Sequence, residues 1–202
     1  IVVVQEQQRR KIRTHVDPTS RPVLLRSTDG GNTWDPDSKS TIISLENEAI
    51  NDPSIRRLTD GTLIVGYFTL RCGGDDEVPV DNPCVRSLDG EHYSWLTGTH
   101  TIRSTDNGRT WDEPVAVPAP TGDATAVSDP IIELPNGELL IPLYCLEDGD
   151  ASFVVVMRST DRGSSWQDPV CVVRDPLKQM EFSEPSLLHL PSGKLICMHR
   201  VH

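Results

Sequence analysis

The sequence predicts an all-β chain built from a repeated four-stranded unit, and two observations carry this prediction. A nine-residue motif occurs three times along the 202 residues. Short apolar runs bounded by Gly, Pro, Asn or Asp surround each copy, as is typical of short strands. No stretch shows the period of an amphipathic helix. A four-stranded sheet repeated about every 55 residues is typical of a β-propeller blade, so we expect about three to three and a half blades.

The repeated motif, called a box below, runs from an Arg-Ser-Thr-Asp segment to a tryptophan. Counted from the serine, its copies occupy residues 27–34, 104–111 and 159–166. The box aspartate can accept backbone N–H bonds, a nearby glycine permits positive φ, and the tryptophan can anchor the turn between neighbouring sheets. We therefore expect the box aspartates to be structural. An acidic residue before proline follows each box aspartate by 23 residues, at Asp52, Asp129 and Glu184.

The spacing of the boxes predicts an insertion. The first two box aspartates are 77 residues apart and the last two are 55 apart. The extra residues fall in a Gly/Asp/Pro-rich stretch at about 70–100, which we expect to be an inserted loop of functional interest. Cys72 and Cys84 in this stretch could form a disulfide if the protein is exported. The remaining cysteines fall in expected strands and are predicted to be buried thiols: Cys145, Cys171 and Cys197.

Composition excludes several functions. A net charge of -11 argues against a non-specific nucleic-acid binder. No apolar run approaches the length of a membrane span. The histidines show no metal-ligand spacing, so neither metal nor cofactor is expected. Both ends of the sequence are apolar runs, which predicts a fragment of a longer chain. Remaining blades or a second copy of this chain would then close the propeller.

The boxes resemble the Asp-box repeats of the sialidase (neuraminidase) superfamily, and the resemblance covers nearly the whole chain. It implies a six-bladed β-propeller in the full protein, with the active site at its mouth. In that superfamily an arginine triad binds the substrate carboxylate, an aspartate is the acid/base, and a Tyr–Glu pair supplies the nucleophile. The expected function is an exo-α-sialidase-like, retaining glycoside hydrolase that removes terminal sialic acid from glycoconjugates.

The resemblance assigns candidate residues one by one. Arg9 or Arg10 ends a segment that looks like the family's first-blade strand, which points an arginine at the mouth. Asp17 stands where the family has its acid/base. Glu184 and Arg200 fall where the family has the glutamate of the nucleophile pair and an arginine of the triad. The family's first triad arginine is expected upstream of this sequence, and its third arginine and nucleophilic tyrosine downstream.

The repeat supports two of these candidates independently. Only the third repeat has glutamate where the others have Asp52 and Asp129. Only the third has arginine seven residues after its turn glycine, at Arg200, where the second has Tyr144. A repeat that departs from its own pattern at two related positions indicates function. The related residues Asp52, Asp129 and Tyr144 are candidates for lining the substrate pocket, with turn capping the alternative for the two aspartates and a place in the core the alternative for Tyr144.

The sequence leaves alternatives open for each residue and for the function. Glu184 could simply cap a turn, Asp17 before proline is an ordinary turn residue, and Arg9 and Arg10 stand in a charged run typical of a solvated face. A non-catalytic Asp-box propeller that binds glycan or protein is the main alternative. A propeller enzyme acting on another acidic sugar is the next. The expected partner is a sialylated glycan or other acidic carbohydrate, which favours an extracellular or periplasmic location.

Overall fold

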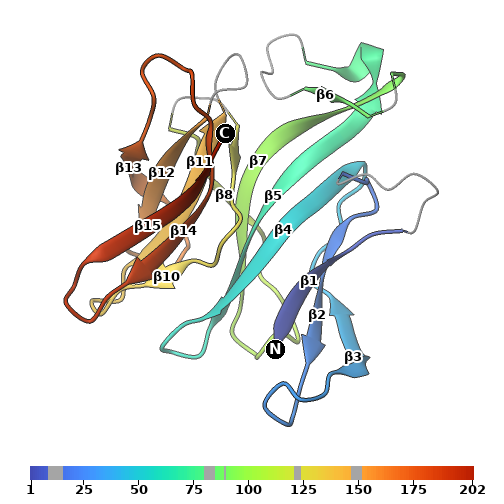
Figure 1. Ribbon diagram of the computed structural model, residues 1–202. Coiled ribbons are helices and arrows are strands. Elements are labelled where there is room, and N and C mark those ends of the chain that lie inside the picture. Colours follow the sequence, from blue (N-terminus) through green and yellow to red (C-terminus); the bar gives the residue numbers. More distant parts are fainter. Residues whose placement is uncertain (9–15, 80–84, 89, 121–123, 147–151) are drawn as a thin grey trace.

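The computed structural model describes residues 1–8, 16–79, 85–88, 90–120, 124–146 and 152–202 (Figure 1). This part of the chain is all-β, as predicted, and contains one 3-10 turn, η1 (Asp75–Glu77). In this part of the chain there is no helix with the length and apolar character needed to span a membrane. In chain order the strands are β1 Val2–Glu6, β2 Arg21–Arg26, β3 Asp35–Thr41, β4 Glu48–Arg57, β5 Leu63–Gly74, β6 Arg86–Ser87, β7 His92–Ser104, β8 Val115–Val117, β9 Thr125–Ala126, β10 Ile132–Glu133, β11 Leu139–Leu146, β12 Ser152–Ser159, β13 Gln167–Val173, β14 Phe182–His189 and β15 Leu195–Val201.

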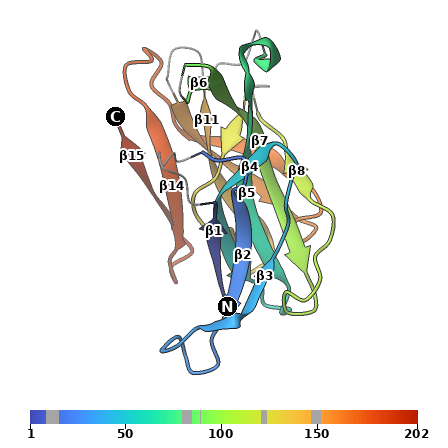
Figure 2. The same ribbon diagram turned by 90° about the vertical axis from the view of Figure 1, so that its right-hand side faces the viewer.

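The strands of the described residues form four antiparallel sheets. The first has the order β1-β2-β3, and the second has the order β4-β5-β7-β6 with β8 paired to β7. The third has the order β10-β11-β12-β13 with β9 paired to β11, and the last is the pair β14-β15. Each sheet is open, and successive sheets stand next to one another in chain order (Figures 1 and 2). This arrangement fits part of a β-propeller.

Apolar side chains fill the spaces between successive sheets. Consecutive residues of a strand point to opposite faces, so the second sheet contributes to two cores. Val65 packs with Leu24 and Ile50 between the first and second sheets. Its neighbour Ile64 packs with Ile141 between the second and third sheets. Burying such a side chain contributes about 1.5–3 kcal/mol, so face-to-face burial holds the sheets together.

The three boxes form turns with nearly identical hydrogen bonds, joining β2 to β3, β7 to β8 and β12 to β13. In each turn the aspartate accepts a 2.9 Å bond from the backbone N–H four residues on and a further bond from the hydroxyl of that residue. The box serine accepts a 2.8 Å bond from the amide of the turn glycine in all three. These bonds hold the pKa of the box aspartates below the ordinary value, with backbone or hydroxyl donors the main cause at Asp29 and Asp106.

The arginine that opens a box reaches the next box along the chain. The Arg26 guanidinium donates to the carbonyl of Asn107 at 2.7 Å. The Arg103 guanidinium donates to the Ser164 hydroxyl at 2.7 Å and to the Arg162 carbonyl at 3.2 Å. These contacts place the three turns next to one another, so all lie at the same end of the sheets. We call this the box end.

The stretch expected to be an inserted loop, about 70–100, is largely paired strand. β5 and β7 run together from Leu63 opposite Ser104 to Gly74 opposite His92. The short strand β6 adds to this hairpin, with Arg86 opposite Ser94. The hairpin therefore extends the second sheet away from the box end. Propensity alone did not reveal this, because glycines are typical of turns, yet Gly73 and Gly74 pair with Tyr93 and His92 in regular strand.

The box tryptophans are unequal, although the sequence predicts one anchoring role for all three. Trp166 is 5% exposed, and its indole N–H donates to the hydroxyl of Thr101 in the preceding sheet at 3.1 Å. Trp111 packs against the core between the first two sheets. Trp34 is 40% exposed, since its own sheet is the first of those described. The cysteine prediction is right for buried Cys145 and wrong for exposed Cys171 and half-buried Cys197, which lie on strands of the outer sheet surface.

Candidate functional site

Most sequence candidates lie at the end of the sheets opposite the box end, which we call the site end. The antiparallel register of the last sheet sets the start of β14 beside the end of β15, with Ser183 opposite Arg200. The end of β11 pairs with the start of β12. The Ser152 hydroxyl there donates to the carbonyl of Phe182 at 2.7 Å. The third and last sheets therefore meet at this end, close to Tyr144 on β11 and Glu184 on β14.

Glu184 and Arg200 form an ion pair. Arg200 Nη1 lies 2.7 Å from Glu184 Oε1, and the two side chains are 52% and 41% exposed. An ion pair with this much solvent contact contributes about 0–1 kcal/mol to stability. Its consequence is therefore positional: it holds a carboxylate and a guanidinium together at the site end, both open to solvent.

Glu184 and Asp52 share an unusual backbone conformation. Their φ values are 51° and 47°, in the left-handed region that non-glycine residues rarely adopt. Both stand at an irregularity in strand pairing, between Asn51 and Ser54 on β4 and between Ser183 and Ser186 on β14. Such backbone costs about 1–3 kcal/mol and is concentrated at functional sites.

The third acidic residue of the repeat behaves differently. Asp129 lies between β9 and β10, outside regular strand, and its φ is not positive. The Asp52 backbone N–H, in contrast, donates to Gln5 Oε1 at 3.2 Å and so connects β4 to the first sheet. The structure thus groups Asp52 with Glu184 by conformation and leaves Asp129 apart from them.

Tyr144 shows which charges surround the candidate site. Burial raises the pKa of Tyr144, and the negative charges of Asp52 and Glu184 raise it further, to about 12. The positive charges of Arg86 and Arg200 act in the opposite direction and lower the pKa. Four charged side chains, two from the second sheet and two from the last, therefore act on one phenol of the third sheet. The structure brings together the predicted residues Asp52, Tyr144, Glu184 and Arg200.

Asp17 lies shortly before β2 of the first sheet and is buried, with 2% exposure. Its carboxylate accepts a 2.9 Å bond from the Thr19 backbone N–H and a 2.5 Å bond from the Thr19 hydroxyl. Its charge reaches Cys72, near the end of β5: burial, followed by the Asp17 charge, raises the pKa of this free thiol to about 11. Asp17 therefore lies at the site end, held by a local turn.

Three sequence candidates lie outside the described residues: Arg9, Arg10 and Cys84. Among the described residues, no cluster of His, Cys, Asp or Glu has the geometry to hold a metal ion. Sequence reasoning missed Arg86, whose charge acts on Tyr144. A signal was present, since Arg86 is the single arginine in the acidic stretch between Cys72 and Trp95.

Four buried serine hydroxyls have no hydrogen-bond partner within the described part of the chain: those of Ser54 and Ser94, and two that stand next to repeat acids. The latter two are Ser183 Oγ, on a residue 2% exposed, and Ser128 Oγ. Each of these two serines directly precedes a repeat acid, Glu184 or Asp129. A buried hydroxyl without a partner costs about 1–3 kcal/mol, so such groups call for an explanation in strain, water or ligand binding.

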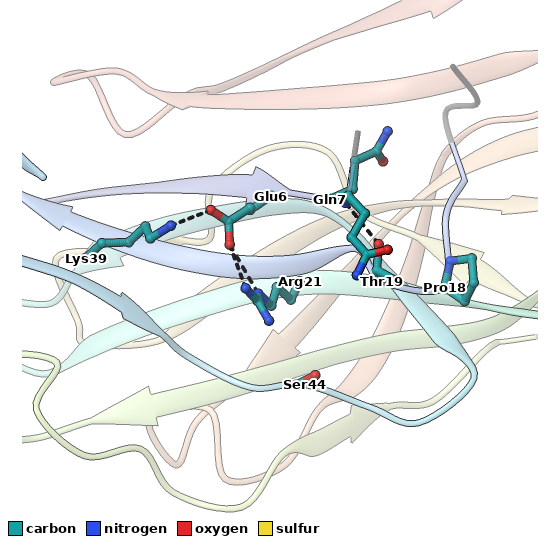
Figure 3. Close-up of a pocket in the computed structure, with 8 residues that line it drawn as sticks. Glu6, Gln7, Pro18, Thr19, Arg21, Lys39 and Ser44 are labelled. Atoms are coloured by element: carbon teal, nitrogen blue, oxygen red, sulfur yellow. Dashed lines mark hydrogen bonds and ion pairs between the residues drawn. The ribbon is translucent and has the colours of Figure 1, made fainter. Parts of the chain in front are cut away.

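The structure also contains a pocket of about 500 Å³ at the first sheet (Figure 3). Its centre is Glu6, which pairs with Arg21 at 2.8 Å and with Lys39 at 2.6 Å. The hydrogen bond from Lys39, then that from Arg21, lowers the pKa of Glu6. The lining is Glu6, Gln7, Gln8, Pro18, Thr19, Arg21, Lys39 and Ser44. It includes none of the residues around Tyr144, so we place the candidate site at Tyr144, where charge and strained backbone coincide.

Comparison with known proteins shows the fold. Neither protein-family models nor curated proteins match this sequence. A protein of unknown function from Dyadobacter fermentans is 24% identical with a TM-score of 0.81, over 96% of this chain and 54% of that one. The Hadza microbial sialidase Hz136 is 20% identical with a TM-score of 0.64, over 94% of this chain and 37% of that one. The Trypanosoma rangeli sialidase in complex with sialic acid is 19% identical with a TM-score of 0.58, over 90% and 29%.

These likenesses define the class of fold. At such identities they show the fold alone, and the chain has a sialidase-like fold. The chain spans about half of the Dyadobacter fermentans protein and about a third of the two sialidases. What the whole protein does is therefore a matter for proposal.

Proposed function

We propose that this chain is part of an exo-α-sialidase-like glycoside hydrolase that removes terminal sialic acid from glycoconjugates with retention. The carrying observation is the Glu184–Arg200 ion pair beside Tyr144 and Asp52, at one end of a sialidase-like fold. The repeat analysis and the family resemblance select the same glutamate and arginine. The propeller in this proposal is six-bladed, and this chain supplies about half of it.

Arg200 binds the substrate carboxylate. A protein of net charge -11 repels an anionic sugar at long range, so local guanidinium groups must supply the attraction. Arginine presents paired N–H donors that match a carboxylate, which lysine does not. The exposed half of the Arg200 side chain leaves donors for this purpose while Glu184 fixes the position of the guanidinium.

Glu184 acts as the base for a tyrosine nucleophile, which the resemblance expects outside this sequence. A neutral phenol suits a substrate whose own carboxylate would repel an anionic nucleophile, and sialidases use tyrosine in this way. The phenol oxygen attacks the anomeric carbon, the bond to the leaving oxygen breaks, and Asp17 gives that oxygen a proton. In the second step Asp17 takes a proton from the water that attacks the anomeric carbon, the bond to the tyrosine oxygen breaks, and Glu184 returns to that oxygen the proton it took in the first step.

Tyr144 contacts the substrate and does not attack it. With a pKa raised to about 12, its phenol is neutral at physiological pH and remains a hydrogen-bond donor. Asp52, held in the same backbone conformation as Glu184, accepts from a sugar hydroxyl. This division leaves proton transfer to Glu184 and Asp17, and the covalent bond to the tyrosine expected outside this sequence.

The test is a fluorogenic sialoside assay on the full-length protein with single variants. Glu184→Gln and Asp17→Asn each lower kcat by about 10²–10⁴-fold, the usual range for general acid–base groups. Arg200→Gln raises KM for the sialoside. Asp37→Asn, an exposed aspartate on β3, leaves both constants unchanged. Activity unaffected by all three site variants rules out the assignment.

A non-catalytic role gives a different result with the same full-length protein. A propeller that only binds acidic glycans retains sialoside in an equilibrium binding experiment but releases no fluorophore. A propeller enzyme for another acidic sugar cleaves a fluorogenic glucuronide in place of the sialoside. The two outcomes separate the alternatives from sialidase activity.

A further inference from the structure

Arg86 is carried into the candidate site by the inserted hairpin. The hairpin of β5 and β7 extends the second sheet at the site end, and β6 is its third strand. Arg86 is the first residue of β6, fixed opposite Ser94 by strand pairing. Figures 1 and 2 both show β6 at the end of the molecule where β11 ends, which is the end that bears Tyr144.

The Arg86 side chain is exposed. Among the described residues it has neither a hydrogen bond nor an ion pair. Arg200, by contrast, is already paired with Glu184. An exposed arginine without a partner is free to bind an external anion, whereas a paired one must share its donors.

The charge of Arg86 is felt at the centre of the site. It lowers the pKa of Tyr144, against the larger raising effects of burial, Asp52 and Glu184. Two acids and two arginines therefore act on the same phenol. Among the described residues, Asp52 and Glu184 bring two negative charges to the site, and Arg200 alone offsets one of them. Arg86, on β6 of the inserted hairpin, adds a second positive charge.

We propose that Arg86 binds the substrate carboxylate alongside Arg200, in addition to the triad arginines expected outside this sequence, so that the insertion is part of the substrate-binding surface. This inference rests on the proposed function, since it names which group of an acidic sugar the insertion contacts. The ligand class is a terminal sugar that carries a carboxylate, and a neutral sugar gains nothing from the contact. The role is binding, without a step in bond making or breaking.

The experiment is isothermal titration calorimetry on the full-length protein with free N-acetylneuraminic acid and, in parallel, its methyl ester. Arg86→Gln weakens binding of the acid by about tenfold or more, as expected for a hydrogen bond to a charged group. The ester binds wild type and variant equally. Arg86→Lys keeps the charge and loses the paired donors, so its affinity for the acid lies between the two.

Arg109→Gln is the matched control. It removes the same charge from an exposed arginine at the box end and leaves binding of the acid unchanged. Equal affinity of wild type and Arg86→Gln for the acid overturns the proposal, and so does an equal loss for acid and ester. A lack of measurable binding of the acid to wild type also overturns it.

Failure of the proposed function has a separate signature. If wild type binds the acid, Arg86→Gln weakens this binding, and the fluorogenic sialoside is not cleaved, then Arg86 is confirmed as an anion-binding residue and the hydrolase proposal fails. Circular dichroism of each variant checks that the exposed substitutions leave the fold intact.

Discussion

The two ends of the sheets differ in how faithfully the repeat is kept. At the box end the three turns repeat the same hydrogen bonds. The bond from the glycine amide to the serine hydroxyl, for example, is 2.8 Å long in all three. At the site end the equivalent positions diverge: the acid is Asp52, Asp129 or Glu184, and only two of the three have left-handed backbone. The hydroxyls of Ser128 and Ser183, also at the site end, have no partner among the residues that the structure describes.

This difference separates turns that the chain repeats from positions at which its repeats diverge, and left-handed non-glycine residues occur at both ends, since Asn107 and Arg162 of two box turns also have positive φ. Turns whose polar groups are satisfied locally fold the same way wherever they occur. Positions that keep a strained backbone or a buried hydroxyl without a partner persist because the surrounding sheets hold them. The box end therefore supports the scaffold, and the site end carries the groups available for chemistry.

The largest expected effect tests the packing of the box end. Trp166→Ala lowers the free energy of unfolding by about 3–5 kcal/mol, because it empties a buried site between the second and third sheets and leaves the Thr101 hydroxyl without its donor. Urea unfolding followed by circular dichroism measures it. Sialoside turnover per folded molecule stays within twofold of wild type, since Trp166 is remote from Tyr144.

Trp34→Ala is the matched comparison for this prediction. The side chain is 40% exposed, so the loss stays within about 1 kcal/mol, as for most surface substitutions. Equal losses for the two tryptophans would contradict the view that a box tryptophan packs on the sheet preceding its own. A loss of turnover in folded Trp166→Ala would contradict the separation of the two ends.

Local signals made the box end predictable. A glycine at positive φ and an aspartate that binds amides two to four residues away act within a few residues, so Asp106 and its turn could be placed from the sequence. The strands followed, since apolar runs between turns are also local patterns. The burial of Trp166 against that of Trp34 was not predictable, because it depends on which sheet lies beside the turn.

The site end was predictable only where the repeat departed from itself. Glu184 and Arg200 stood out because the other repeats supply a comparison. The left-handed backbone of Asp52 and Glu184 carries no local mark such as glycine, since the neighbouring strands impose it. Arg86 reaches the site through an insertion whose strand pairing is a tertiary feature. Residues that meet through pairing between distant segments have no fixed spacing in the sequence, so the sequence does not predict that they meet.

The second effect compares a satisfied serine with a partnerless one. Ser159→Ala at the box end costs about 1–3 kcal/mol, because the buried hydroxyl binds the Gly163 amide and the Asp161 carboxylate, both at 2.8 Å. Ser183→Ala at the site end changes stability by less than about 0.5 kcal/mol, since its hydroxyl leaves no protein partner behind. Thermal and urea unfolding of both variants measure the contrast.

A cost for Ser183→Ala as large as that for Ser159→Ala would show that the Ser183 hydroxyl has a stabilising partner. The site end would then be as fully satisfied as the box end. A Ser183→Ala variant of normal stability that binds N-acetylneuraminic acid more weakly would instead sharpen the comparison, because it places the hydroxyl in the binding surface.

The smallest expected effect is the pH dependence of the stability that one box turn contributes. Bonds from the Thr110 backbone and hydroxyl, followed by the Ser104 hydroxyl, hold the pKa of Asp106 well below its ordinary value of 3.8. A carboxyl with a lowered folded-state pKa stabilises the protein above its unfolded pKa, and this contribution is lost as pH falls through the folded pKa. Asp106→Asn therefore lowers the urea midpoint at pH 7, and the difference in midpoint from wild type narrows steadily below about pH 4.

Asp37→Asn, which changes an exposed aspartate on β3, is the control and has the wild-type midpoint both at pH 7 and below pH 4. A gap for Asp106→Asn that stays constant down to about pH 2 would mean that the turn depends on the shape of the side chain and not on its charge, and the box end would then owe its regularity to sterics alone.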